Sequence, residues 1–476
     1  MEKNKKKMLS AFSIIIILIF VLGFSSLLLP HAQIVGEEVV NGSGVIPAKI
    51  SDILMAPILG FADAIDVCIF VIVLGGFLAI VAKTEALETG IKVLVQKLKG
   101  KETILIPILM FIFSIGGTTY GMLEETVGFY ALLSATMVAA GMDTLVASSI
   151  VLLGAGSGVL GSTINPFAVG AAVSALPDGM EVNQGTIIAL GVILWLTTYA
   201  ISTYFVMKYA KKVQKDKGST ILSLQEQDAM KKTYGKEKNL NAKLTGTQKL
   251  TLYLFGLTFA IMVIGFIPWG DFGIDFFDFT GLLTGSPLGL WYFNESTLWF
   301  LLMSIIISFI NGYKEHEFID TFIEGTKDMM SVVLIIAVAR GASVLMQTTH
   351  LDNYIIYNAS EALRNVPATI FGPLNYLLHV GLSVLVPSSS GLATLSTPIM
   401  GPLAANLGYS VETTIMTFVA ANGLVNLITP TCGAIMGGLA LAKVDYTTWV
   451  KWSAKVIAVI AIVNMIIITI AMAILH

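Results

Sequence analysis

Long apolar stretches separated by short polar ones run along most of this chain. A helix needs about 20 consecutive apolar residues to cross the hydrocarbon core of a bilayer. Lipid offers backbone groups no hydrogen-bond partner, so a spanning segment must satisfy its own, as a helix does. The pattern therefore predicts an all-α polytopic membrane protein. Runs of spanning length occur at 11–30, 58–82, 187–207, 250–268, 296–312, 328–347 and 452–475.

Two further apolar regions, 102–170 and 367–442, are interrupted by turn-forming and hydroxyl residues. The first contains GGTTYGMLEETVGFY and the second VPSSSGLATLSTPIM. Irregular backbone inside a membrane must line a protein cavity, because lipid cannot satisfy its polar groups. An ordinary loop is the alternative, although apolar runs flank both stretches closely.

The simplest geometry for such a stretch is a re-entrant helical hairpin that enters the membrane part-way and turns back. We expect one hairpin over about 102–140, turning at Thr118–Tyr120, and a second over about 367–407, turning at Ser388–Ser390. Carbonyl and hydroxyl groups freed at these turns can bind a cation or a substrate.

Each region is interrupted again further along. When the two regions are aligned, Ser162–Pro166, which reads STINP, matches Asn426–Pro430, which reads NLITP. Proline removes a backbone donor and disfavours helix at the residue before it. We expect broken helices over about 144–175 and 411–442, whose half-helix ends offer a positive dipole to a carboxylate and free carbonyls to small cations.

Charged residues are distributed unevenly between the polar segments. Residues 1–10 include four lysines, and the stretch from Lys208 to Lys249 holds eleven. Cytoplasmic loops of membrane proteins carry an excess of basic residues. Segments 31–57 and 269–297 are mainly acidic and belong outside. The N-terminus is therefore expected in the cytoplasm and the C-terminus outside a bacterial cytoplasmic membrane.

The two halves of the chain share an order of elements. Residues 73–91 align without gaps on 338–356. In each half a surface helix follows, at 83–101 and 350–366, and the charges place the first inside and the second outside. This order and orientation predict two inverted repeats, the usual build of a secondary transporter. A membrane scaffold with accidental symmetry is the alternative.

The expected organisation begins with a cytoplasmic N-terminus. A first inverted repeat follows, then a lysine-rich loop with a connector helix at 250–268 and an outer loop, and finally a second repeat. These parts cover 1–10, 11–207, 208–295 and 296–475, respectively.

Composition narrows the class of protein further. The 476 residues are 55% hydrophobic and 12% charged, too few charges for a soluble domain. We find no Walker loop, GxSxG or CxxC motif, and His316-Glu317 lacks the second histidine of a zinc protease. Cys68 and Cys432 lie far apart in apolar segments and suggest neither a disulfide nor a metal site. We expect no enzyme activity, catalytic residue, resident cofactor, metal or nucleic-acid partner.

Three ionisable residues inside the predicted membrane region are candidates for function. Glu124 and Glu125 follow the first hairpin turn, and the second half has no acidic residue at the matching positions. Two carboxylates suit a cationic substrate group or a carried proton. Arg340 lies mid-helix; it either pairs with these acids structurally or receives a substrate carboxylate. Asp63 and Asp66 lie near the outer end of their helix, where a solvated helix end is the expectation.

Hydroxyl and amide residues near the turns complete the candidate site. Glycine packing motifs could explain the glycines there, but not the amides and hydroxyls beside them. The substrate-binding candidates are Thr118, Thr119, Glu124, Glu125, Asn165, Arg340, Ser388, Ser389, Ser390, Asn422 and Thr429. The ion-binding candidates are Thr118, Ser157, Asn165, Ser390, Asn422 and Thr429.

Three motifs are similar to those of a known family. GGTTYGMLEET (116–126), GSTINP (161–166) and VPSSSG (386–391) resemble the YfcC-type proteins of the DcuC family of C4-dicarboxylate carriers, within the ion-transporter superfamily. The resemblance covers nearly the whole chain. It implies a homodimer in the membrane lipid, with a scaffold domain and a transport domain that moves like an elevator. It also implies Na⁺ as a coupling ion near the hairpin tips of some relatives.

Family and residues point to different substrates. A dicarboxylate carrier should offer positive charge, whereas this hairpin offers Glu124 and Glu125. The YfcC-type branch is similar to ArcD-like arginine/ornithine antiporters, and an acidic pair fits a cationic amino acid. We therefore expect a secondary transporter of basic amino acids, by exchange or ion-coupled uptake. The alternatives are a Na⁺- or proton-coupled carrier of C4-dicarboxylates or other small carboxylates, a channel or a membrane enzyme.

Overall fold

The computed structural model describes residues 11–35, 38–40, 42–87, 89–90, 93, 102–177, 179–235, 243–266, 269–272, 274 and 276–475. Within these ranges the chain is almost entirely helical, and its strands are the short pair β1 (Ile34–Val35) and β2 (Glu38–Val39). Seven of the described helices are long and apolar enough to cross a membrane. This confirms the predicted all-helical, multi-pass class.

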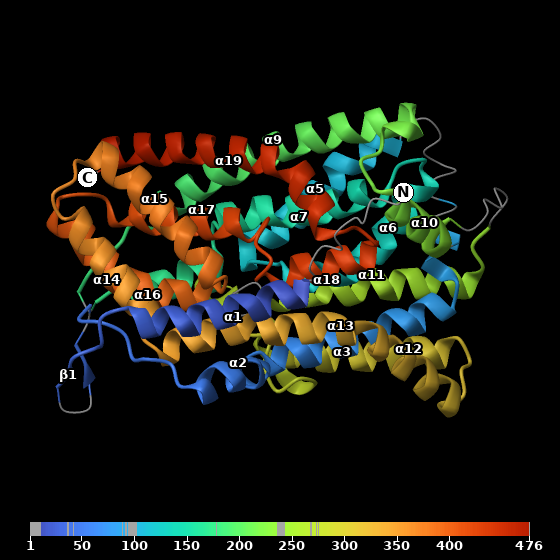
Figure 1. Ribbon diagram of the computed structural model, residues 1–476. Helices are drawn as coiled ribbons and strands as arrows, with labels where there is room; N and C mark the ends of the chain where they lie inside the picture. The colour runs from blue at the N-terminus through green and yellow to red at the C-terminus, as the bar shows by residue number, and fades with distance from the viewer. Residues whose placement is uncertain are drawn as a thin grey trace, which may run out of the picture.

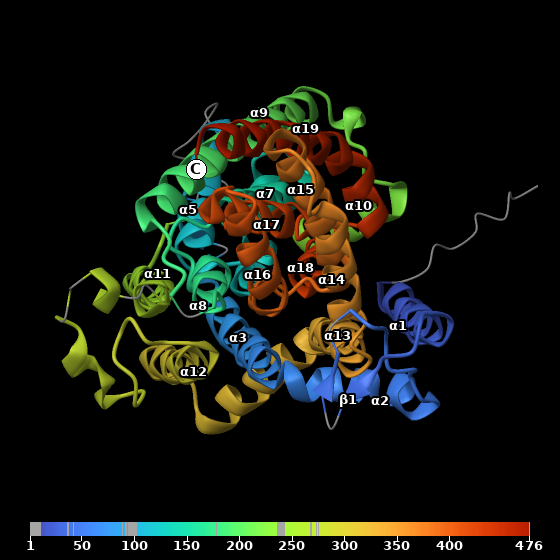
Figure 2. The ribbon, with the colours of Figure 1, turned by 90° about the vertical axis from the view of Figure 1, so that its left-hand side faces the viewer.

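One group of helices forms a layer along one side of the molecule (Figures 1 and 2), which we call the framework layer. Interlocking aromatic rings hold it together: the ring of Phe77 lies 5.0 Å from that of Phe300 and 5.9 Å from that of Phe255. Its helices are α1 (Ala11–Leu28), α2 (Ile50–Asp63), α3 (Ile65–Lys83), α11 (Gly246–Phe266), α12 (Phe293–Ile310) and α13 (Glu315–Thr348).

Most of the remaining helices form a second body, the core bundle, with α7 and α17 inside and α9 and α19 along its outer edge (Figure 2). Every residue of α7 is buried, because glycines let neighbouring helices approach it closely. The members are α5 (Leu105–Tyr120), α6 (Phe129–Ala139), α7 (Thr144–Gly161), α8 (Ala171–Ser174), α9 (Gln184–Lys215), α15 (Ala368–Leu385), α16 (Ser389–Asn406), α17 (Val411–Val425), α18 (Gly433–Ala442) and α19 (Tyr446–Ile474).

Two short helices lie at opposite ends of the long axis, α10 (Leu224–Tyr234) at one and α14 (Leu351–Leu363) at the other (Figure 1). The carboxylate of Glu226 in α10 accepts hydrogen bonds from the Asp445 backbone nitrogen (2.8 Å) and the Thr448 hydroxyl (3.1 Å). The loop that carries α10 is therefore docked on the start of α19. Short 3₁₀ turns are η1 (Glu102–Ile104), η4 (Lys217–Ser219), η5 (Trp269–Phe272) and η6 (Asp278–Leu282).

Several helices differ in extent from the prediction. The apolar run at 58–82 is not one helix, because the chain leaves helical geometry at Ala64, between α2 and α3. Helix α2 also begins inside the segment predicted as an outer loop. Helix α13 starts well before residue 328, since Lys314 and Glu317 cap an additional polar portion. Most of the predicted surface helix at 83–101 lies outside the described residues.

Candidate functional site

A cavity of about 200 Å³ lies between the framework layer and the core bundle. Both interrupted regions of the core bundle reach it, and so does the break between α2 and α3. Its polar and turn-forming lining residues are Asp63, Asp66, Gly121, Glu124, Tyr292, Arg340, Ser388, Ser389, Ser390, Asn426, Thr431, Cys432 and Gly433.

The tip of the first hairpin is shaped by a glycine. Helix α5 ends at Gly121, whose φ of 82° is left-handed. A Cβ atom there would lie 2.7 Å from the Asn165 amide nitrogen, so the tip needs glycine for both space and conformation. The chain then forms a 3₁₀ turn, η2 (Glu124–Gly128), whose first residue lines the cavity.

Polar side chains bind this tip to the break in the next helix. The backbone nitrogen of Thr163 donates to the Thr118 hydroxyl (3.1 Å), and the two hydroxyls lie 3.2 Å apart. The Asn165 amide donates to the Ser162 hydroxyl (2.9 Å). Its carbonyl oxygen accepts from the Phe167 backbone nitrogen (2.9 Å) and caps the π-helical turn η3 (Pro166–Gly170). The Thr118–Thr163 bonds thus fix the hairpin against the end of α7, and the Asn165 bonds hold the shape of the break itself.

The tip of the second hairpin is tighter. Helix α16 starts directly after Ser388, whose hydroxyl caps it by accepting from the Gly391 backbone nitrogen (3.2 Å). Ser388, Ser389 and Ser390 all line the cavity. The positive end of the α16 dipole is therefore directed at the cavity, where it favours an anionic group.

Two asparagines bind this tip to the interruption between α17 and α18. The Asn422 side-chain oxygen accepts from the Ser389 hydroxyl (2.8 Å) and from the Asn426 amide (3.1 Å). The Asn426 amide also donates to the Pro387 carbonyl (3.0 Å). A second link runs through Thr431, whose hydroxyl lies 2.7 Å from that of Thr429 and donates to the Val384 carbonyl (3.1 Å).

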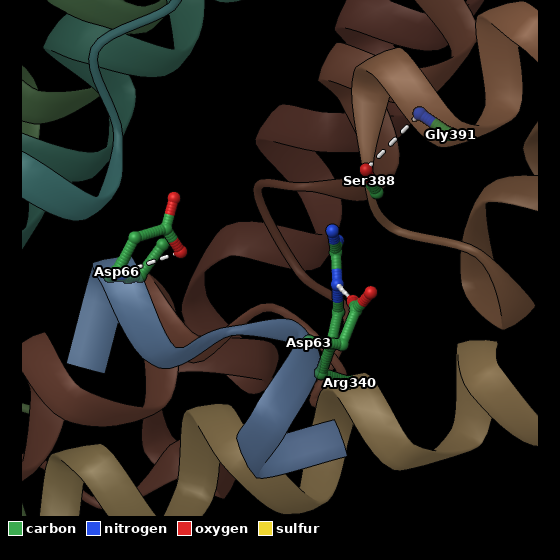
Figure 3. Close-up of polar contacts among 6 residues, drawn as sticks. Asp63, Asp66, Arg340, Ser388 and Gly391 are labelled. Atoms are coloured by element: carbon green, nitrogen blue, oxygen red, sulfur yellow. Dashed lines mark hydrogen bonds and ion pairs between the residues drawn. The ribbon is translucent and has the colours of Figure 1, made fainter. Parts of the chain in front are cut away.

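The framework wall of the cavity carries three charged residues (Figure 3). Asp63, the last residue of α2, forms an ion pair with Arg340 of α13. Asp66, in the first turn of α3, accepts a hydrogen bond from the Val67 backbone nitrogen (2.8 Å). With Glu124 from the opposite wall, three carboxylates and one guanidinium line the cavity. Its lining is therefore acidic on balance.

The predicted site residues divide into three groups. Those that line the cavity are Glu124, Arg340, Ser388, Ser389 and Ser390. Those that support the tips from behind are Thr118, Asn165, Asn422 and Thr429. Thr119 instead donates to the Ile115 carbonyl of its own helix (2.7 Å), and Ser157 contacts the Ser202 hydroxyl of α9 (3.2 Å). The Glu125 side chain lies outside the described part of the chain.

Sequence reasoning missed Asp63 and Asp66, which do not form a simple solvated helix end. Their proximity in sequence, two acids separated by Ala64 and Ile65 inside an apolar run, was the available signal. A structural pairing of Arg340 with the acids of the first tip was one of two alternatives; among the described side chains, Arg340 forms its ion pair with Asp63. Among the described residues no group of three or more His, Cys, Asp or Glu side chains could hold a metal ion.

Known proteins resemble this chain over most of its length. A Haemophilus influenzae (strain Rd) protein described as uncharacterized is 30% identical over 424 residues, covering 88% of this chain and 78% of that protein. The Escherichia coli K12 protein named "Putative basic amino acid antiporter YfcC" is 24% identical over 420 residues, covering 86% and 78%.

Solved structures also align with nearly the whole chain. The Alcanivorax borkumensis YdaH transporter has a TM-score of 0.48 at 12% identity and 98% coverage of both chains. Neisseria gonorrhoeae MtrF, described as one of a class of antimetabolite efflux pumps, has a TM-score of 0.40 at 17% identity, covering 99% of this chain and 96% of its own.

A family model matches almost from end to end. It is described as "DcuC: C4-dicarboxylate anaerobic carrier" and covers residues 8–473. Together with the spanning helices, this match identifies a multi-pass membrane transporter with a small-molecule substrate. The chain belongs to the DcuC family of carriers.

Proposed function

We propose that this protein is a secondary active transporter that carries basic amino acids, by exchange or by ion-coupled uptake. The charge of the cavity is the observation that carries this proposal. Three carboxylates face the cavity, and the single guanidinium there is already paired with Asp63. Glu124 and Asp66 remain to attract a cationic side chain such as that of arginine or ornithine. The name of the E. coli relative points the same way.

A carboxylate substrate is the competing proposal, and specific features favour it too. The family description names C4-dicarboxylates, and the α16 N-terminus and Arg340 both suit an anion. A dicarboxylate would nevertheless have to approach three acidic side chains, and the guanidinium among the described lining residues is paired with one of them. Like charges in a poorly solvated site repel strongly, so we favour the basic amino acid.

For the mechanism, we propose that the two halves are inverted repeats. The register that aligns 73–91 on 338–356 also places the start of α2 and the end of α3 on the two ends of α13. It pairs Gly60 with Gly325 and Gly76 with Gly341. Gly60 packs against Gly341, and Gly325 packs against Gly75. Such reciprocal contacts between matched segments are what a two-fold relation produces.

The core bundle repeats this pattern. The register that pairs the N-caps Asp143 and Ser410 also pairs Gly156 with Gly423 and Leu160 with Leu427. Gly156 packs against Leu427, and Gly423 packs against Leu160. We therefore propose that the core bundle moves as one body against the framework layer, an elevator movement that carries both hairpin tips across the membrane.

Further elements of the proposal come from the family resemblance. A homodimer would form through the framework layer in a bacterial cytoplasmic membrane, with the N-terminus inside. Sodium or a counter-substrate would drive the flux, with Na⁺ bound by oxygen atoms near the hairpin tips.

A ligand screen followed by transport tests this function. The purified protein is heated with arginine, ornithine, lysine, succinate or fumarate, with and without Na⁺, and arginine uptake is measured in proteoliposomes loaded with ornithine. Basic amino acids should raise the melting temperature by mass action and should exchange. Stabilisation and uptake of dicarboxylates alone would contradict the proposal.

Chemical modification of the two native cysteines tests, in the same preparation, whether the substrate binds in the cavity. Cys432 lines the cavity, whereas the Cys68 thiol faces the Val333 carbonyl in the framework layer. Substrate should slow modification of Cys432 by a small thiol reagent, as followed by mass spectrometry, and leave Cys68 unaffected.

A further inference from the structure

We infer that the Asp63–Arg340 ion pair recognises the zwitterionic head of an α-amino acid. The substrate carboxylate binds Arg340, and the substrate ammonium binds Asp63. This inference rests on the proposed function and extends it, because it separates α-amino acids from diamines and from dicarboxylates, which share only one of these charges.

The pair is placed where a substrate can reach it. Both residues line the cavity, and 36% of the Arg340 side chain and 43% of the Asp63 side chain are exposed. Figure 3 shows Arg340 reaching from α13 toward Ser388, with Asp63 beside it. A structural ion pair that only joined two helices would be expected to lie within their contact, not at the cavity wall.

The charges match the head group in sign and spacing. An ion pair and a zwitterion each hold one positive and one negative group at close range, so one can insert into the other head to tail. Two ion pairs then replace one without any change in net charge. Exposed ion pairs contribute little net stability, so the resting pair offers little resistance to this exchange.

The opposite wall adds a second contact for the carboxylate. Arg340 points at the capped N-terminus of α16, where Ser388 lines the cavity. A carboxylate bound to Arg340 would therefore also face the positive end of the α16 dipole. The cationic side chain is then left for Glu124 or Asp66. The head group would thus bridge the framework layer and the core bundle.

The interrupted helix supports the assignment. Helix α13 continues without a break over the stretch that matches α2 and α3. The break at Ala64 lies between Asp63 and Asp66, and both line the cavity. Arg340 has Gly75 as its match. Asp63 is matched by Asp328, but a glycine stands where the arginine would be needed, so the pair itself occurs in one half only, as expected for substrate recognition.

Analogues of arginine that each lack one charge provide the test. Agmatine lacks the carboxylate, and 5-guanidinopentanoate lacks the α-ammonium. Dissociation constants are measured by calorimetry on the purified full-length protein. The wild-type protein should bind arginine about tenfold or more tightly than either analogue, because a site built for a polar group rejects a ligand that lacks it.

The variants should then show a crossed pattern. Arg340→Gln should weaken the binding of arginine by about tenfold or more. The same variant should bind agmatine as tightly as the wild-type protein does, or more tightly. Asp63→Asn should weaken the binding of arginine to a similar extent and leave the affinity for 5-guanidinopentanoate unchanged instead. The matched control is Arg364→Gln, which breaks the Arg364–Glu361 ion pair on α14 and should change no affinity.

Each outcome separates the two levels of the proposal. The inference would be overturned if the two variants lost affinity equally for arginine and both analogues. It would also be overturned if the wild-type protein bound agmatine as tightly as arginine. If the wild-type protein binds none of the three guanidinium compounds, the proposed function itself fails. Should Arg340→Gln not fold, Arg340→Lys and the wild-type ranking of analogues still decide the matter.

Discussion

The two hairpin tips reach the same cavity with opposite chemistry. The first tip turns through Gly121 and a five-residue 3₁₀ segment and brings an acid, Glu124, to the cavity. The second turns directly into α16 and brings three serine residues and the positive end of a helix. One tip therefore favours a cationic group and the other an anionic group.

Behind the tips, the two halves are alike. Asn165 supports the first tip through the break after α7, and Asn422 supports the second through Ser389. Hydrogen bonds from amides and hydroxyls satisfy the interrupted backbone in both places, as the hydrocarbon region requires. The difference teaches that the support is shared between the halves, while the chemistry offered to a substrate is set at the tips.

Removing the acid from the first tip should have the largest effect. Glu124→Gln keeps the shape of the side chain but removes its charge. Hydrogen bonds to charged groups contribute about 1.5–3 kcal/mol, so affinity for arginine should fall roughly 10- to 100-fold. The measurement is arginine uptake and binding in proteoliposomes.

The matching position in the second half provides the control. Thr394 donates its hydroxyl to the Ser390 and Gly391 carbonyls of its own helix. Thr394→Ala should therefore leave arginine binding close to the wild-type value. Equal effects of the two substitutions would remove the proposed contrast between the tips.

Much of the fold follows from the sequence because its cause is local. Lipid requires long apolar helices, and Gly, Pro, Ser and Asn inside apolar runs mark where the backbone departs from a helix. Helix–turn–helix segments lie where both interruptions occur, α5 to α6 and α15 to α16. The all-helical, multi-pass class could thus be predicted.

The composition of the cavity could be predicted only in part. Whether a polar residue near a tip lines the cavity or supports it depends on the direction of its side chain, which periodicity does not give. Ser388 and Asn422 are both polar residues of the second interrupted region, 367–442, yet Ser388 lines the cavity and Asn422 lies behind it. The break at Ala64, which brings Asp63 to Arg340, depends on packing between distant segments.

A smaller effect is expected where α7 and α17 cross. A Cβ atom on Gly423 would lie 2.6 Å from the Leu160 Cα atom, whereas one on Gly156 would meet the end of the Leu427 side chain. Backbone cannot move aside as a flexible side chain can. Gly423→Ala should therefore destabilise the protein by about 1–3 kcal/mol, as overpacking does. Gly156→Ala should cost less.

Thermal unfolding of the two glycine variants in detergent checks this order. A larger loss of stability for Gly156→Ala than for Gly423→Ala would show that the two sides of the crossing are not packed as described. Equal small losses would mean that α7 and α17 can separate slightly without cost.

The smallest effect is expected at the caps of the two buried helices. Ser410 caps α17, whereas the titratable Asp143 caps α7 by accepting from the Val146 backbone nitrogen (3.0 Å). Burial raises the pKa of Asp143, and its hydrogen bonds from Thr220 and Tyr209 oppose that rise without cancelling it. The folded state therefore holds this proton to higher pH than the unfolded state, whose aspartate pKa is about 3.9.

Stability from this group is accordingly present at low pH and is lost as pH rises through the raised pKa. Asp143→Asn keeps a capping oxygen but cannot titrate. The advantage of the wild-type protein over this variant should shrink as pH rises, which melting temperatures across the acidic to neutral range would reveal. A difference in melting temperature that does not change with pH would show that Asp143 stays ionised in the folded protein. Helix α7 would then be capped by a permanent charge, which the Ser410 cap of α17 lacks.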